Sequence, residues 1–281
     1  MKPDEAAFEG HIAGWLADHG AYTGGKLGTQ SPDFDAGRGM DTAELFAFIE
    51  ATQRGEWAKV LKTHGEEPAA AQSAFLDRLT KELDARGTVD VLRHGLVYAG
   101  HEKAEFALAF FRPASGLNPL LAERYDANRL TVTRQLRYEA GSNKTVDLGL
   151  FVNGIPVATA EVKNPLTGQT VDHAKAQYRT DRDPKNLTLR RCVVHFAVDT
   201  GQVFMTTRLD GERTVFLPFN RGDGVVAGNP PNPSGHRTAY LWESVWQKDA
   251  WLDILARFIH VEPADKGSKA PATMIFPRFH Q

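Results

Sequence analysis

Two acids and a lysine in one short stretch of the chain have the residue types and the spacing of a metal-dependent hydrolytic site. Asp147 is followed, after thirteen intervening residues, by Glu161-Val162-Lys163, and both acids lie in apolar, strand-like runs that Asn153-Gly154 joins. Carboxylate oxygens are the ligands that hard divalent cations such as Mg²⁺ prefer. A lysine beside them can orient or deprotonate a water molecule and stabilise developing negative charge. This D…(D/E)xK pattern indicates metal-assisted hydrolysis of a phosphodiester bond.

The strand periodicity decides whether the two acids can share one site. Successive side chains of a strand point to opposite faces, and Asn-Gly between alternating runs is a strong hairpin signal. A two-residue turn at 153–154 would pair Asp147 with Ala160 and separate the acids. A three-residue loop, with its glycine left-handed in a bulge, places Asp147, Glu161 and Lys163 on one face. We predict this loop, because it also leaves an apolar face for the core, formed by residues 146, 148, 150, 156, 158, 160 and 162.

Spacing alone leaves two interpretations open, since an Asp and a Glu-x-Lys also occur on half-exposed hairpins that have no catalytic role. Longer motifs narrow the choice. Residues 128–138 read NRLTVTRQLRY, residues 144–165 read KTVDLGLFVNGIPVATAEVKNP, and residues 274–281 read MIFPRFHQ. Together and in this order, they resemble the amino-terminal nuclease region of the type I restriction enzyme R subunit (HsdR). The resemblance covers most of the chain from about residue 85 onward.

The resemblance implies a restriction-endonuclease-like α/β fold, with a mixed sheet flanked by helices and a helical element before it. It implies that Asp147, Glu161 and the Val162 carbonyl hold Mg²⁺, while Lys163 acts on the attacking water. It also implies double-stranded DNA as the substrate, and the methylation and specificity subunits of a type I restriction-modification complex as partners. In this family the R subunit joins the nuclease to a superfamily 2 helicase motor. The competing expectation is a non-catalytic DNA-binding or subunit-docking module.

The end of the chain resembles the segment just ahead of the ATPase motor in such subunits, where a glutamine recognises adenine. This glutamine is Gln281, and no G-x-x-x-x-G-K-[ST] phosphate loop occurs in the 281 residues. We therefore expect 262–281 to be a linker leading to a helicase motor that this chain lacks, with ATP used only by the full-length subunit. We expect His280 and Gln281 to be poorly ordered unless Phe276 and Phe279 anchor them.

Two further residues are candidates beside the metal ligands. Glu9 lies next to the apolar stripe of an amphipathic helix predicted at 4–19. Related nucleases place an additional acid there, although a glutamate in a first turn also suits the helix dipole. Gln177 lies on the helix after the Glu-x-Lys strand, where it could orient the lysine or the DNA. The family carries Q-x-x-x-Y in this area, whereas the tyrosine here is Tyr178, so its participation stays open.

Basic residues flank the acids on both sides and predict a DNA contact. Three of them follow the Glu-x-Lys strand at spacings of four and three, which places them on one helix face. Such a stripe could follow a phosphate backbone, but a solvated helix face has the same pattern. The candidates are Arg129, Arg134, Lys175, Arg179 and Arg182.

Composition limits the class of protein. The 281 residues are 42% hydrophobic, enough for a sizeable core. The single cysteine, Cys192, excludes an intramolecular disulfide and a cysteine-rich zinc site, which suits the cytoplasm. We find no transmembrane run and no signal peptide, so we expect no membrane partner. The net charge of −2 argues against a uniformly basic nucleic-acid binder but permits a local basic surface.

The pattern along the chain predicts one endonuclease domain over 1–261, in three parts. A helical part over about 1–87 contains helices at 4–19, 41–63 and 67–86. A sheet core over about 88–220 contains a crossover helix at 167–182, capped by Thr167 or Thr170. A tryptophan-rich helix follows at 239–259. The predicted strands cover 105–111, 129–138, 145–152, 155–163, 192–199, 202–207 and 213–217. We expect four to six of them to form one mixed sheet.

Overall fold

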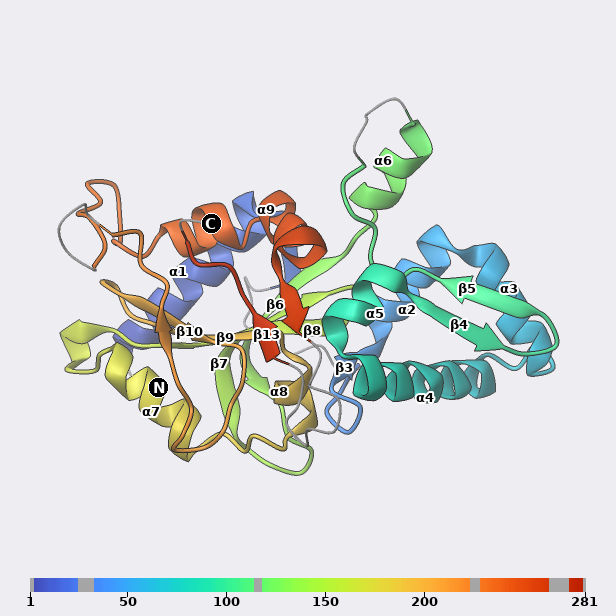
Figure 1. Ribbon diagram of the computed structural model, residues 1–281, viewed down its shortest axis with the longest axis horizontal. Helices are drawn as coiled ribbons and strands as arrows, with labels where there is room; N and C mark the ends of the chain where they lie inside the picture. The colour runs from blue at the N-terminus through green and yellow to red at the C-terminus, as the bar shows by residue number, and fades with distance from the viewer. Residues whose placement is uncertain (1–2, 25–32, 114–117, 223–227, 263–272, 280–281) are drawn as a thin grey trace.

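The computed structural model describes residues 3–24, 33–113, 118–222, 228–262 and 273–279, and Figure 1 shows two lobes. The larger lobe is built on a seven-stranded mixed sheet with the order β1-β6-β7-β8-β9-β10-β11. Its strands are β1 (Tyr22–Gly24), β6 (Leu130–Arg137), β7 (Thr145–Val152), β8 (Ile155–Val162), β9 (Val194–Val198), β10 (Val203–Thr206) and β11 (Leu217–Pro218). The sheet and its flanking helices confirm the predicted α/β class. It has more than the expected four to six strands, because two very short strands extend its edges.

The centre of the sheet is an antiparallel meander of β6, β7 and β8. β9 then pairs parallel to β8, which requires a crossover connection. That connection carries α7 (Val171–Thr180) and the short α8 (Leu187–Arg191). Thr170 caps α7, as the sequence predicted.

Helices cover both faces of the sheet (Figure 1). α1 (Pro3–His19) lies against β6, β7 and β8 on one face, and α7 lies against β8 and β9 on the other. The first face holds the main core, where Leu148, Ala158 and Ala160 are fully buried. The second face holds two smaller apolar clusters around Tyr178 and Ala197. A central sheet covered on both faces explains why all eight residues of β8 are buried.

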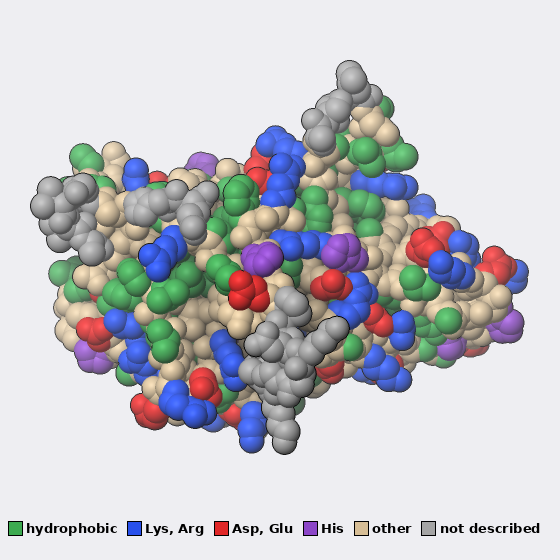
Figure 2. All heavy atoms as spheres, in the orientation of Figure 1, with side chains coloured by type: hydrophobic (Ala, Val, Ile, Leu, Met, Phe, Trp, Pro, Cys, Tyr) green, Lys and Arg blue, Asp and Glu red, His purple; other side chains and the backbone are tan. Residues whose placement is uncertain are grey.

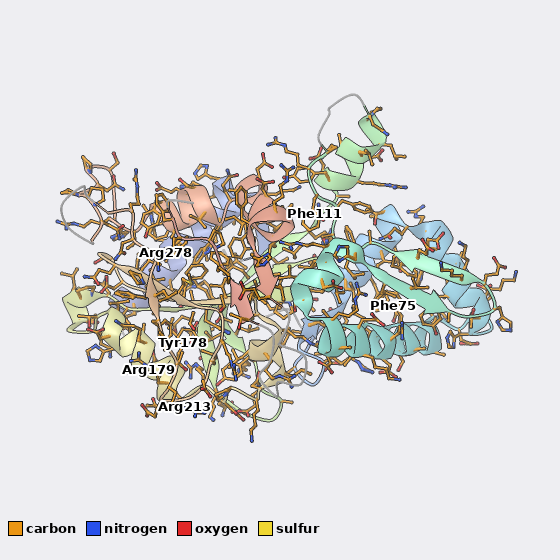
Figure 3. The ribbon with its side chains drawn as sticks, viewed as in Figure 1. Phe75, Phe111, Tyr178, Arg179, Arg213 and Arg278 are labelled. Atoms are coloured by element: carbon orange, nitrogen blue, oxygen red, sulfur yellow. The ribbon has the colours of Figure 1, made fainter. Side chains whose placement is uncertain are left out.

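The smaller lobe is mainly helical and surrounds Phe75, which Figure 3 labels. Its elements are α2 (Thr42–Thr52), α3 (Arg54–Thr63), α4 (Pro68–Arg86), α5 (Thr88–His94), and the hairpin of β4 (Leu96–Ala99) and β5 (Lys103–Phe106). Three differences from the sequence prediction occur here. The helix expected at 41–63 is interrupted at Gln53, α5 was not predicted, and the strand expected at 105–111 ends at Phe106 in a separate hairpin. The side chain of Gln53 explains the interruption, because its amide forms two hydrogen bonds with the backbone of Ala107.

Two short pairings, β2 (Phe34–Asp35) with β3 (Met40–Asp41), and β12 (His260–Glu262) with β13 (Thr273–Ile275), complete the fold together with α6 (Pro119–Asp126). Neither these strands nor α6 and α8 were predicted, because all are very short. No helix among the described residues is long and apolar enough to cross a membrane.

The tryptophan-rich helix expected at 239–259 is broken into three pieces. A π-helical turn at Leu241–Val245 and another at Ile254–Phe258 flank α9 (Lys248–Asp253). Its three tryptophans are fully buried, and the ring centroid of Phe276 lies 6.1 Å from that of Trp251. Phe279 instead lies against Tyr240, at 4.8 Å between ring centroids. His280 and Gln281 lie outside the described residues.

The β7–β8 hairpin has the predicted pairing next to Asp147. However, the turn and the strands that produce this pairing differ from the prediction. Val152 pairs with Ile155, so the turn holds two residues, and the predicted three-residue loop is wrong. Asn153 and Gly154 both have positive φ, 50° and 78°, as in a type I′ turn. The extra residue lies in β8 instead: Leu150 pairs with Ala158 and Phe151 with Pro156, so Val157 is the bulged residue. Beyond it Leu148 pairs with Ala160, which sets Asp147 opposite Glu161.

Five of the seven residues predicted for the apolar face lie in the main core, and Val146 and Pro156 do not. Leu148, Leu150, Ala158, Ala160 and Val162 all belong to the main core. Val146 instead packs with Leu136 and Tyr138 in a second cluster. The alternation of faces therefore breaks between 146 and 148, next to the candidate site.

The Asn153-Gly154 turn is buried under the smaller lobe. The Gly154 carbonyl accepts from the Asp41 backbone N–H at 2.8 Å. The Asn153 amide donates to the Leu108 carbonyl at 2.9 Å, and its oxygen accepts from the Arg129 N–H at 2.7 Å. These bonds join the hairpin to three separate segments of the chain.

The first prediction concerns Gly154. A Cβ there would lie 2.1 Å from the Asp41 carbonyl oxygen, and the positive φ adds strain for any other residue. Gly154→Ala should lower the free energy of unfolding by at least about 2 kcal/mol more than Gly168→Ala. Gly168 is a matched control, since its φ is 77° and no atom lies within 4 Å of its Cβ position. Equal losses of stability in urea unfolding would contradict the buried turn.

Candidate active site

The structure brings together the three residues of the D…(D/E)xK pattern. Asp147 lies near the start of β7, and Lys163 follows the last residue of β8. Oδ2 of Asp147 accepts a hydrogen bond from the Val162 backbone N–H at 2.7 Å and lies 3.4 Å from Nζ of Lys163. The Lys163 ammonium also donates to the Val162 carbonyl oxygen at 3.2 Å. The predicted carboxylate, carbonyl and ammonium therefore share one small volume.

Glu161 is a fully buried carboxylate with one oxygen engaged and one not. Oε1 accepts from Arg182 through Nε at 2.7 Å and Nη2 at 2.6 Å. Oε2 is buried and has no hydrogen-bond partner within the described part of the chain. Burial raises the pKa of Glu161 well above its ordinary value and the charge of Asp147 raises it further, while Arg182 and Lys163 oppose the shift. An unpaired buried oxygen is costly, and a bound cation would remove that cost.

Glu9 and Gln135 form a second layer behind Asp147. Glu9, on α1, is 1% exposed, and its two oxygens accept from Nε of Arg134 and Nε2 of Gln135, both at 2.8 Å. The same Gln135 nitrogen donates to Oδ1 of Asp147 at 3.1 Å. The predicted helical acid therefore reaches the site, but it is joined to Asp147 through an amide. Burial raises the pKa of Glu9.

Gln135 is a site residue that the sequence analysis missed. It lies in β6 with φ of 50°, a left-handed backbone that is strained for a residue other than glycine. Its side-chain oxygen accepts from the Thr145 hydroxyl at 2.9 Å, which fixes the amide between the two acids. Gln135 belongs to the 128–138 motif, but only the pairing of β6 with β7 shows that it lies beside Asp147.

The structure places the residues of the crossover helix in different surroundings. Gln177 has a buried Oε1 without a hydrogen-bond partner among the described residues. Tyr178 is fully buried, and its hydroxyl contacts Thr159 at 2.8 Å, which in turn contacts His195 at 2.7 Å. Tyr178 thus belongs to a core hydrogen-bond network.

The expected basic stripe is not a continuous exposed surface. α7 ends at Thr180, and the guanidinium of Arg182 turns inward to Glu161 with 8% of its side chain exposed. Its assignment to a DNA-contacting helix face is therefore wrong. The other candidates also have partners within the protein: Arg129 with Glu44, Arg134 with Glu9, Lys175 with Asp172 and Phe204, and Arg179 with the Thr214 carbonyl and Phe216.

The donor set fits a small, hard cation. The described residues contain no group of three or more His, Cys, Asp and Glu side chains arranged to hold a metal. The site offers instead two carboxylates and the Val162 carbonyl, all oxygen donors of the kind Mg²⁺ prefers. The unpartnered Oε2 of Glu161 is the feature that calls for such a ligand.

The comparison with known families agrees with this arrangement. Residues 121–214 match the model of the type I restriction enzyme R protein N terminus (HSDR_N), which is 94 of the chain's 281 residues. The match contains Asp147, Glu161 and Lys163, and it confirms the resemblance to the R-subunit N terminus that the motifs predicted. No curated protein matches the chain.

The second prediction tests the strained position of Gln135. Gln135→Ala and Gln135→Gly both remove the amide that joins Glu9 to Asp147, and loss of these hydrogen bonds to charged groups should cost about 1–3 kcal/mol of stability. The glycine variant should be more stable than the alanine variant by roughly 1 kcal/mol, because only alanine is strained at positive φ. Urea unfolding of both variants measures the difference. Equal stabilities would mean that the backbone at 135 is not left-handed.

Proposed function

We propose that this chain is the endonuclease region of a type I restriction enzyme R subunit. In this proposal it hydrolyses phosphodiester bonds of double-stranded DNA with Mg²⁺, and cutting is coupled to the motor of the complete subunit. The family match over 121–214 supports the subunit assignment. The chemistry is supported mainly by one observation, the buried and unpartnered Oε2 of Glu161 on the strand opposite Asp147.

Asp147, Glu161 and the Val162 carbonyl would hold the ion. When bound, it would supply positive charge at the scissile phosphate. Because Arg182 occupies only Oε1 of Glu161, the other oxygen is left for this role. The positive charge of Arg182 opposes the rise in the pKa of Glu161 that burial and Asp147 cause. Gln135 restrains Asp147 from the other side.

Lys163 is the residue best placed to act on the reacting water. Its ammonium lies between Oδ2 of Asp147 and the Val162 carbonyl, and 5% of its side chain is exposed. From there it can donate a hydrogen bond to the attacking water and to the phosphate oxygen on which charge develops. Gln177, with its unpartnered amide oxygen, is a candidate for positioning that water or the DNA.

The family assignment also supplies the proposed partners. Methylation and specificity subunits would choose the DNA sequence and assemble with the R subunit. The motor, which uses ATP in the full-length subunit, would deliver DNA to the nuclease. Recognition of a sequence is therefore not expected of this chain.

The third prediction is a metal-dependent gain in stability. Mg²⁺ or Mn²⁺ should raise the thermal unfolding midpoint of the chain, since a ligand at 100 times its Kd adds about 2.7 kcal/mol. Asp147→Asn and Glu161→Gln should lose most of this gain, because each removes a charged oxygen donor. A Lys81→Gln variant, changed on the exposed surface of α4, should keep it. An identical midpoint shift in all four proteins would rule out binding at this site.

The fourth prediction concerns cleavage by the complete restriction complex. Asp147→Asn, Glu161→Gln and Lys163→Met should each lower the rate of DNA cleavage by at least about 100-fold, the size expected for loss of a transition-state contact. ATP hydrolysis should be unchanged, because none of these residues belongs to the motor. Full cleavage by Lys163→Met would remove the lysine from the mechanism. Full cleavage by all three would favour a docking module.

A further inference from the structure

Three cations outside the predicted stripe are exposed and unpaired. Lys185 follows the crossover helix, Arg190 lies on α8, and Arg208 lies on the loop after β10. All three side chains are exposed, and none forms an ion pair with any residue that the structure describes. This contrasts with Arg134 and Arg182, whose guanidinium groups bind Glu9 and Glu161. The cations available to an external anion are therefore not those that the sequence indicated.

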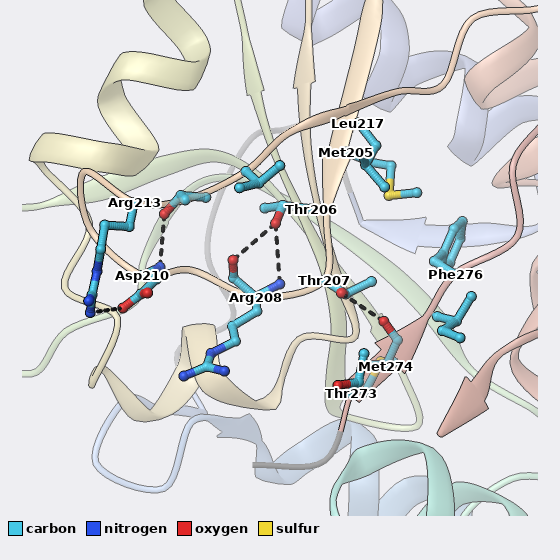
Figure 4. A pocket seen from close by; sticks show the side chains of 13 residues that line it. Met205, Thr206, Thr207, Arg208, Asp210, Arg213, Leu217, Thr273, Met274 and Phe276 are labelled. Atoms are coloured by element: carbon cyan, nitrogen blue, oxygen red, sulfur yellow. Dashed lines mark hydrogen bonds and ion pairs between the residues drawn. The ribbon is translucent and has the colours of Figure 1, made fainter. Parts of the chain in front are cut away.

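The three cations line one groove of about 810 Å³ between α8 and the loop after β10. We call it the basic groove and define it by Lys185, Arg190 and Arg208. A neighbouring hollow of about 410 Å³ shares Thr207, Arg208 and Asp210 with it (Figure 4). Figure 4 shows the Arg208 guanidinium pointing away from the paired side chains around it.

The carboxylates beside the basic groove do not neutralise it. Asp210 accepts from Nη2 of Arg213 at 3.1 Å, so its charge is already offset. Asp183 accepts from the Lys185 backbone N–H at 2.8 Å, which directs its carboxylate to the turn. The groove therefore carries an excess of positive charge. At the lower left of Figure 2, Lys and Arg side chains lie among Asp and Glu side chains.

A short piece of chain connects the basic groove to the candidate active site. Arg182 points inward to Glu161, and three residues later Lys185 points outward into the groove. His195 lines the groove and pairs across the sheet with Thr159, two residues before Glu161 on the same strand. A ligand in the groove would thus run over the elements that hold the carboxylates.

We propose that the basic groove binds the phosphate backbone of duplex DNA without regard to sequence, which rests on the proposed nuclease function. Three unpaired cations from separate elements fit an extended polyanion better than a single phosphate. Neutralising several phosphates releases counterions, so such binding weakens steeply as the salt concentration rises. The groove would hold the duplex while the carboxylates act on one of its bonds.

The experiment measures binding of the 281-residue chain to a fluorescent 30-base-pair duplex by anisotropy, in EDTA and over a range of KCl concentrations. Removing metal separates DNA binding from cleavage, so a chain that binds DNA but never cuts it still gives an interpretable result. The test variant combines Lys185→Gln, Arg190→Gln and Arg208→Gln. It should bind at least about tenfold more weakly at low salt, and the slope of log K against log [KCl] should fall by about 2–3, or 0.9 per lost phosphate contact.

A matched control removes the same charge from the other lobe. It combines Arg54→Gln, Lys62→Gln and Lys103→Gln, all exposed on α3 and β5 of the smaller lobe and none among the residues that line the groove. The control should keep affinity and slope, and both triple variants should unfold at the wild-type urea midpoint. Equal losses in the two variants would show a general charge effect and overturn the proposal. Wild-type affinity in the test variant, or no duplex binding by the wild-type chain at low salt, would overturn it as well.

Discussion

The register between β7 and β8 is the constraint on which the candidate site depends. A shift of one residue would send Asp147 and Glu161 to opposite faces of the sheet. Two features hold the register: a tight turn at Asn153-Gly154 buried under the smaller lobe, and a bulge at Val157 of β8. The turn alone would give the wrong pairing at Asp147, and the bulge corrects it. The smaller lobe therefore helps to set the site although it contributes none of its ligands.

The candidate site holds buried negative charge, which is unfavourable, and neighbouring cations partly offset it. Glu161 is buried beside a second carboxylate, which raises its pKa, and only one of its oxygens is hydrogen-bonded. Arg182 and Lys163 supply the opposing positive charge. Gln135 has a strained, left-handed backbone, and its side-chain amide joins Asp147 to Glu9. Buried charges of this kind seldom add stability to a protein. A ligand that binds the unpartnered oxygen of Glu161 would explain the buried carboxylates better than a stabilising role would.

Much of the architecture could be predicted from the sequence. The helices at 4–19 and 67–86, the four central strands and the cap at Thr170 follow from periodicity, apolar runs and capping residues, which are local signals. The errors have tertiary causes. Gln53 breaks a predicted helix because its side chain bonds Ala107, and the tryptophan-rich segment breaks into π-helical turns where three indoles are packed into the core. Very short strands and helices carry too few residues for any periodic signal.

For the candidate site, too, the sequence determined some features and the tertiary structure decided others. The sequence by itself determined the acids, the lysine and the resemblance to the R-subunit N terminus, because these depend on residue type and on short-range spacing. Only the tertiary structure decided what surrounds them. It moved Arg182 from a surface stripe to Glu161, placed Gln135 between Asp147 and Glu9, and left Lys185, Arg190 and Arg208 as the unpaired cations along one groove. The physical reason is that a charged side chain takes its partner from whatever the fold brings near it, and such neighbours are far apart in the chain.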